Sequence, residues 1–347
     1  MVLEERIKSF SALGEILRDS LDGKPTLFSS QLNSLIETLH LTNHWFTPEN
    51  VKLAVRSIAE ELTFFNLTKL CSFYPALQDK YKPLRIGLVM AGNIPLAGFH
   101  DLFSVLITGN EAVVKTSSKD AGLIHFITDT LSAINPSFTG KISFAEGILT
   151  EFDAIIATGS DNSSRYFGHY FGRYPGIIRK NRNSIAVIDG NESDAELTAL
   201  GKDVFSYFGL GCRSVSKIII PAGYDLTTIT GNWESYSGIV GHTKYANNYD
   251  FNKAVFIVNK EKFTDTGYLL MMESSGLASP VAVLYYEFYD SAEQVNQLRE
   301  KLNEKIQCVI GRKDIPFGKA QSPALWDYAD GIDTIDFILK KNNPGLL

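Results

Sequence analysis

The first eighty residues carry apolar side chains at helical spacing. One stripe consists of Leu3, Ile7, Phe10 and Leu13. Apolar residues three and four positions apart predict an amphipathic helix with one buried face. Further along, Thr47 precedes Pro48, and this pair is typical of a helix N-cap followed by proline at the first helical position. We therefore expect residues 1–80 to form an N-terminal helical region without catalytic chemistry.

From residue 84 onward the pattern changes to short apolar runs that alternate with helical stretches. The runs expected to be strands cover residues 86–90, 112–114, 141–145, 153–157 and 184–188. Strands that alternate with helices predict a parallel sheet with crossover helices, which is an α/β fold. Such sheets bind ligands at the carboxyl ends of their strands. Asn93, Lys115 and Ser160 all lie at or just after the ends of these expected strands.

A cysteine stands at a turn in the second half of the chain. A helical apolar pattern runs as far as Phe208, and residues 217–220 are predicted to form a buried strand. Between them, Gly209 and Gly211 allow a tight turn that carries Cys212. One interpretation of Cys212 is a small residue buried at a turn, since free cysteines are usually buried and inert. The other is a nucleophile on a loop held between two regular elements.

The rest of the chain repeats the α/β pattern less regularly. The expected strands are residues 255–258, 281–286 and 306–310, and Ser291 is expected to cap the helix before the last of them. The apolar run at residues 335–339 is expected to be an edge strand of a sheet. The sequence therefore predicts two α/β domains preceded by helices.

Composition narrows the class of protein. The 347 residues are 44% hydrophobic and 21% charged, with a formal net charge of −6. These values are ordinary for a folded soluble protein, and the acidic balance argues against binding to nucleic acid. No apolar run reaches the roughly 18 residues of a membrane-spanning helix, so no membrane insertion is expected. Three cysteines without CxxC spacing and six scattered histidines argue against disulfides and metal sites, and favour a reducing, cytoplasmic location.

The polar residues at the strand ends are the candidates for chemistry. The Asn93 amide could donate to an oxyanion, or it could bind its own backbone in a turn. Lys115 ends a buried strand, where it could meet a ligand or solvent. Thr158, Gly159 and Ser160 end another strand and could hold a ligand or simply cap the next helix. The sequence contains no Walker loop, no His-Glu-x-x-His and no Gly-x-Ser-x-Gly motif.

Four motifs follow one another in a recognisable order. They are Ala91-Gly-Asn-Ile-Pro-Leu96, Gly109-Asn-Glu-Ala-Val-Val-Lys115, Ala157-Thr-Gly-Ser160 and Gly209-Leu-Gly-Cys-Arg-Ser214. In this order and spacing the chain resembles the aldehyde dehydrogenase superfamily, and more closely its acyl-CoA reductase branch of the LuxC type. The resemblance implies a Rossmann-type nicotinamide-binding domain at residues 81–185 and an α/β catalytic domain at residues 186–312. Residues 313–347 would return to the cofactor domain or to a dimer partner.

The resemblance also implies roles for individual residues. Cys212 would be the catalytic nucleophile, and Asn93 together with the Cys212 backbone N–H would bind the oxyanion. The nicotinamide cofactor would be held by Lys115, Ser118, Thr158, Gly159 and Ser160. The superfamily further implies a homo-oligomer, expected here as a dimer.

Two departures from the superfamily pattern bear on substrate and cofactor. Residues 178–184 contain no carboxylate where aldehyde-oxidising members carry a water-activating glutamate. Without a base, a thioacyl enzyme persists until another thiol takes the acyl group, which suits coenzyme A. Ser118 replaces the carboxylate that binds the adenosine ribose in NAD-using members. Removing that charge removes repulsion toward a 2′-phosphate, so we expect NADPH, with NADH as the second option.

We therefore expect NAD(P)H-dependent reduction of a fatty acyl-CoA to the aldehyde through a Cys212 thioacyl enzyme, with coenzyme A as a product. Two alternatives stay open. One is a reductase of acyl phosphates, which uses a similar fold and cysteine. The other is a non-catalytic acyl-carrying or interaction subunit whose cofactor site has decayed.

Overall fold

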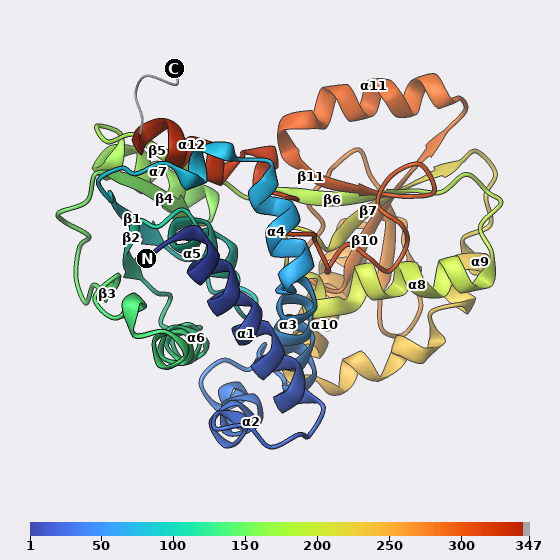
Figure 1. Cartoon of the computed structure of the whole chain (residues 1–347). Coiled ribbons are helices and arrows are strands. Elements are labelled where there is room, and N and C mark those ends of the chain that lie inside the picture. The colour runs from blue at the N-terminus through green and yellow to red at the C-terminus, as the bar shows by residue number, and fades with distance from the viewer. Residues whose placement is uncertain (343–347) are drawn as a thin grey trace. The chain divides into compact units, whose positions relative to one another are not determined.

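The computed structural model describes residues 1–342, which form two units (Figure 1). The first unit comprises residues 1–181 and the described residues from Pro323 onward, and the second comprises Arg182–Ser322. The expected domain boundaries lay after residues 80, 185 and 312. The helical residues 1–80 share one core with the sheet that follows them, so they are part of the first unit.

The first unit contains a five-stranded parallel sheet. Its strands, in spatial order, are β3 (Ile142–Phe144), β2 (Glu111–Lys115), β1 (Arg85–Val89), β4 (Ala154–Thr158) and β5 (Gly176–Arg179). Four of these strands confirm the expected runs. The fifth, β5, was not expected, because Ile177 and Ile178 are its only apolar residues. The run 184–188, expected in this sheet, instead supplies a strand of the second unit.

Helices cover both faces of this sheet. The helices of the unit are α1 (Leu3–Leu21), α2 (Ser29–Thr38), α3 (Pro48–Glu61), α4 (Phe64–Ser72), α5 (Phe99–Ile107), α6 (Ala121–Ile134), α7 (Asp161–Phe171) and α12 (Thr334–Asn342). Phe10 of α1 packs edge to face on Phe103 of α5, with ring centroids 4.9 Å apart. On the other face, Phe171 of α7 packs with Ile155 and Ala157 of β4. Thr47 caps α3 as expected, accepting a hydrogen bond from the Asn50 N–H.

The run at residues 335–339 forms helix α12, so the expected edge strand is wrong. Ile335, Ile338 and Leu339 are buried, and their spacing of three and four places them on one helical face. The Asp333 side chain accepts a hydrogen bond of 2.8 Å from the Asp336 N–H at the start of the helix. The pattern has helical period, and its shortness obscured this.

The second unit contains a six-stranded sheet. Its spatial order is β11 (Ile306–Ile310), β6 (Asn183–Val187), β7 (Val215–Pro221), β10 (Val283–Tyr289), β9 (Leu270–Glu273) and β8 (Thr264–Asp265). All neighbours are parallel except β8, which is antiparallel to β9. The helices are α8 (Asp194–Phe205), α9 (Leu226–Gly231), α10 (Thr243–Asn259) and α11 (Ala292–Leu302). Ser291 caps α11 as expected.

Alternating residues of the second sheet face different helices. Ile218 and Ile220 of β7 pack in the core that contains α8, whereas Ile219 packs with Val295 of α11. Figure 1 shows α8 and α11 on opposite sides of this sheet. The expected strand at residues 255–258 is wrong, because these residues end helix α10. Phe256 is buried but Val258 is 79% exposed, so this apolar run does not form a buried strand.

Short 3-10 helices lie at Leu39–Leu41, Pro75–Gln78, Pro136–Phe138, Ser206–Gly209, Glu234–Gly241, Asn303–Lys305 and Ala329–Gly331. The one at Ser206–Gly209 leads directly into the turn that carries Cys212.

Candidate active site

Cys212 lies in the turn between α8 and β7, and its side chain is exposed. The two other cysteines, Cys71 and Cys308, are buried. Burial raises the pKa of the Cys71 thiol to about 11, which keeps it protonated and unreactive at neutral pH. Cys212 is therefore not buried, contrary to the first interpretation. Of the three thiols, Cys212 is the one that a substrate can reach.

The backbone before Cys212 is strained. Tyr207, Phe208 and Gly209 have φ angles of 53°, 58° and 76°, and positive φ is rare for bulky side chains. Such conformations persist only where the surrounding structure fixes them, and they are frequent at active sites. Here the Phe208 ring packs against His242, with ring centroids 4.3 Å apart, and Tyr207 is buried. The approach to Cys212 is thus held in one conformation.

Hydrogen bonds hold the backbone of Cys212 and the side chain of the residue that follows it. The Ser184 hydroxyl donates to the Cys212 carbonyl at 2.9 Å. Arg213 donates through Nε to the Ala320 carbonyl at 2.5 Å. Its guanidinium therefore binds the chain near residue 320, and its charge favours the ionised form of Asp203. The Asp203 carboxylate in turn accepts the Ala320 N–H at 3.0 Å.

Asp203 is a buried carboxylic acid near the end of α8, the helix that precedes this turn. Its side chain is fully buried and also accepts the Gly318 N–H at 2.6 Å. Burial raises the pKa of Asp203 to about 6, although the two backbone hydrogen bonds act in the opposite direction. The carboxyl therefore changes charge just below neutral pH.

In the first unit, parallel pairing brings three expected ligand-binding turns to one edge of the sheet. Val89 of β1 pairs with Lys115 on one side and with Ala157 on the other. The turns that carry Asn93 and Ser118 follow Val89 and Lys115, and Thr158 ends β4 directly before the turn at Gly159. The first two turns touch, since a side-chain carbon at Gly92 would collide with Ser117.

Asp120 ties the same two turns together. Its Oδ2 accepts the N–H of Leu96 at 2.8 Å, and Leu96 has a positive φ of 58°. Asp120 is 2% exposed, and its other oxygen, Oδ1, has no hydrogen-bond partner among the described residues. Burial raises the pKa of Asp120 well above its usual range.

The expected cofactor residues have defined surroundings. The Lys115 ammonium donates to the Gly147 carbonyl at 2.8 Å, so it is not simply immersed in solvent. Ser160 caps α7 by accepting the Ser163 N–H at 3.3 Å, which confirms a capping role. A side-chain carbon at Gly159 would lie 2.8 Å from Phe167. Hydroxyls, backbone N–H groups and one ammonium gathered at this edge suit the ribose hydroxyls and phosphates of a dinucleotide.

Arg179, one of three cationic residues in the stretch 178–184 that contains no carboxylate, has a structural role. Arg179 is buried, pairs with Asp101 at 3.0 Å and donates to the Thr334 hydroxyl at 2.8 Å. Among the side chains that the structure describes within residues 1–342, no group of three from His, Cys, Asp or Glu is placed to hold a metal ion. None of the helices in that range has both the length and the apolar content required to cross a bilayer.

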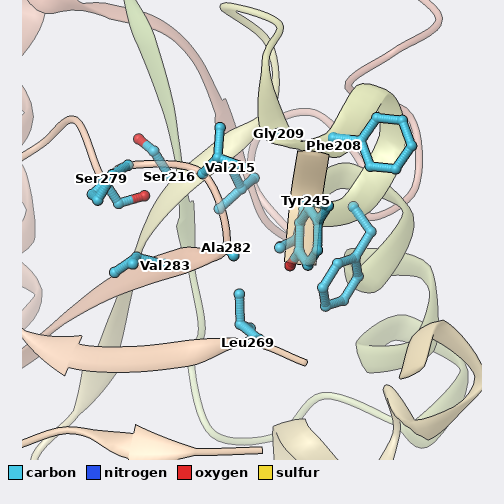
Figure 2. A pocket seen from close by; sticks show the side chains of 13 residues that line it. Phe208, Gly209, Val215, Ser216, Tyr245, Leu269, Ser279, Ala282 and Val283 are labelled. Carbon is cyan, nitrogen blue, oxygen red and sulfur yellow. The ribbon is translucent and has the colours of Figure 1, made fainter. Parts of the chain in front are cut away.

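A pocket lies against the turn that carries Cys212, and the sequence patterns did not predict it. It holds about 20 Å³ of free space, little more than the room for one water molecule. Phe208 and Gly209 line it from one arm of the turn, and Val215 lines it from the other (Figure 2). Most of the remaining wall is apolar, and the Tyr245 hydroxyl is occupied by the Tyr268 carbonyl at 2.9 Å.

Comparison with known families gives a match over more than half of the chain. The family model described as acyl-CoA reductase (LuxC) matches residues 30–228. A long-chain acyl-protein thioester reductase from Photobacterium leiognathi is 27% identical over 146 residues, which cover 38% of this chain and 30% of that protein. Another from Aliivibrio fischeri is 24% identical over 200 residues, covering 52% and 41%. The matches thus span less than half the length of these relatives.

Solved structures show the same fold. An aldehyde dehydrogenase from Physcomitrella patens, solved with succinate, superposes with a TM-score of 0.65 at 12% identity, covering 99% of this chain and 85% of that one. An aldehyde dehydrogenase from Mycobacterium tuberculosis, solved with NAD+, has a TM-score of 0.61 at 13% identity, covering 86% and 71%. The aldehyde-dehydrogenase-like α/β fold expected from the sequence is therefore confirmed.

Proposed function

The chain belongs to the acyl-CoA reductase (LuxC) family, and from this premise we propose that it reduces a long-chain acyl thioester to the aldehyde through a thioacyl intermediate on Cys212. The observation that carries the proposal is the exposure of Cys212 at a strained, hydrogen-bonded turn while the other two thiols are buried. A nucleophile must be reachable, and it must be held in a fixed position.

In the proposed acylation, the Cys212 thiolate adds to the thioester carbonyl. The tetrahedral oxyanion then collapses, the carbon–sulfur bond to the donor breaks, and the donor thiolate leaves and takes a proton. The Cys212 backbone N–H is proposed to bind the oxyanion. Asn93 is proposed to donate a second hydrogen bond, as expected from its motif. Donors of this kind each contribute about 10²–10³ in rate.

The second half-reaction needs a hydride, which is the chemistry that a reduced nicotinamide supplies when it is bound. Lys115, Ser118, Thr158, Gly159 and Ser160 are the residues proposed to hold that cofactor. Once the thioacyl carbon is reduced, collapse of the thiohemiacetal on Cys212 releases the aldehyde and restores the thiolate. The absence of a carboxylate from residues 178–184 supports reduction over hydrolysis, because no base there activates water.

The finer features of the proposal concern the donor and the cofactor. We propose acyl-CoA as the donor, following the family description; the relatives are named for acyl-protein thioesters, which share the same reacting group. NADPH is proposed over NADH because Ser118 carries no charge to repel a 2′-phosphate. A homodimer and a cytoplasmic location stay predictions.

Intact-mass measurement after incubation with a long-chain acyl-CoA tests both half-reactions. Without cofactor, the wild type and a Cys71→Ala control should gain one acyl mass, and Cys212→Ala should gain none. Adding NADPH should remove the adduct and release aldehyde. An adduct on Cys212→Ala, or reduction by that variant at near wild-type rate, would overturn the proposal. Acylation without binding of NADPH or NADH would instead favour an acyl-carrying subunit, and activity restricted to acyl phosphate would favour the other alternative.

A further inference from the structure

A buried serine and a buried cysteine form a hydrogen-bonded line that ends on the nucleophile residue. Ser184 on β6 is fully buried, and Cys308 on β11 is 8% exposed. The Ser184 hydroxyl lies 2.9 Å from the Cys212 carbonyl oxygen and 3.0 Å from the Cys308 sulfur. Strand β6 lies between β11 and β7. Cys308 therefore approaches Ser184 from one neighbouring strand, and Cys212 approaches it from the turn that leads into the other.

The chemistry of the three groups fixes the direction of the hydrogen bonds. A carbonyl oxygen can only accept, so the single hydroxyl proton of Ser184 points to Cys212. The Ser184 oxygen then has only acceptor capacity left, and the Cys308 thiol donates its proton to it. Both buried polar groups are thereby satisfied, as buried polar groups must be.

A β-bulge lies beside this line. Ser184 pairs with Val215, whereas the next residue of β6, Ile185, pairs with Lys217. Ser216 is therefore the extra residue on β7. Its hydroxyl donates to the Leu277 carbonyl at 2.7 Å and lies 3.4 Å from the Ser184 carbonyl. Bulges next to active sites commonly redirect a side chain or a strand end. Here the extra residue, Ser216, is the second residue of β7 and lies four positions after Cys212.

We propose that Ser184 is a positioning residue for Cys212, and that Cys308 supports it by donating to its hydroxyl. Ser184 touches no substrate in this scheme. It acts by fixing the peptide of Cys212 at the end of the strained turn, so that the sulfur and the Cys212 N–H keep their positions through acylation. This inference rests on the proposed acyl transfer at Cys212, because that is the reaction the position serves.

Ser184→Ala removes the hydrogen bond to the Cys212 carbonyl and leaves the volume of the side chain nearly unchanged. We expect the rate of acyl-adduct formation at Cys212 to fall about 10–100-fold, since small misplacements of a nucleophile have effects of this size. NADPH binding should be unchanged. The matched control is Ser104→Ala, because Ser104 is also fully buried and also donates to a carbonyl, that of His100, at 2.8 Å. The control should acylate like the wild type.

Variants of Cys308 test its supporting role separately. Cys308→Ala should slow acylation about threefold, and Cys308→Ser, which restores a hydroxyl donor, should return it to within twofold of the wild type. The double variant Ser184→Ala/Cys308→Ala should be no slower than Ser184→Ala, because Cys308 acts only through Ser184. Full additivity of the two effects would overturn the supporting role of Cys308.

Hydrogen–deuterium exchange separates this inference from the proposed function. Ser184→Ala should speed exchange in the peptide that covers residues 206–215, and Ser104→Ala should leave that peptide unchanged. If wild-type protein forms no acyl adduct, the proposed function fails, and the exchange result still decides whether Ser184 holds the turn. Unchanged exchange at 206–215 in Ser184→Ala, or undiminished acylation by that variant, would overturn the positioning role.

Discussion

The buried ion pair between Lys217 and Glu287 should respond very differently to removal of its two members. Lys217 lies on β7 and Glu287 on the neighbouring β10, and the ammonium donates to the carboxylate and to the Ser274 carbonyl, the latter at 2.8 Å. The Lys217 side chain has no exposed surface, whereas that of Glu287 is 35% exposed. The cost of each substitution therefore depends on which charge is left behind.

Glu287→Ala leaves an ammonium inside the protein with a single carbonyl as partner. Breaking a buried pair in this way typically costs about 3–5 kcal/mol. Lys217→Met leaves a carboxylate that already meets water over a third of its surface and can recover hydration. The methionine fills most of the vacated space, so the main loss is the hydrogen bond to Ser274, about 1–2 kcal/mol. We expect Glu287→Ala to be the more destabilising by about 2 kcal/mol.

Urea unfolding of the two variants, followed through the buried Trp233 of the same unit and by circular dichroism, measures this difference. The exposed pair Lys8–Glu4, at 64% and 71% exposure, is the control, and replacing either member by alanine should leave the free energy of unfolding almost unchanged, because water screens both charges. A cost for Lys217→Met equal to or above that of Glu287→Ala would refute the reasoning from burial.

Three further predictions concern the titrating acid and the site. Because burial raises the folded pKa of Asp203 to about 6, its contribution to the free energy of unfolding should fall by up to about 3 kcal/mol as pH rises from about 4 to 6 and then level off; comparing wild type with Asp203→Asn across this range isolates it. Asn93→Ala should slow acylation by about 10²–10³ without changing NADPH affinity, and an unchanged rate in stopped-flow assays would exclude an oxyanion role. Ser118→Glu should weaken NADPH binding about tenfold or more and leave NADH binding within a few-fold, as fluorescence titration would show; equal losses for both would contradict a 2′-phosphate contact.

The parts of the fold that the sequence could predict are those fixed by local pattern. Long periodic stretches such as α1 and α6 have one buried face, and buried strands such as β1 and β7 have enough apolar residues to stand out. Two of the errors fell on runs of four or five mostly apolar residues, where strand and helix look alike. Residues 255–258 end a 17-residue helix, and residues 335–339 belong to α12. Whether such a run forms a helix or a strand depends on which of its residues are buried, and tertiary packing determines that.

In the candidate site, too, local features could be predicted from the sequence and long-range contacts could not. That Cys212 stands on a turn follows from the glycines beside it, and its exposure agrees with that position. The residues behind the turn could not be predicted from their neighbours, because Ser184 is 28 positions from Cys212 and 124 from Cys308. The sequence did hold one signal: a serine inside a fully buried strand must find a hydrogen-bond partner. Which partner it finds depends on the strand order β11-β6-β7 and on the bulge at Ser216. An exposed cysteine can therefore be anticipated from its own turn, whereas the groups that contact it from other strands are known only once the strand order of the sheet is known.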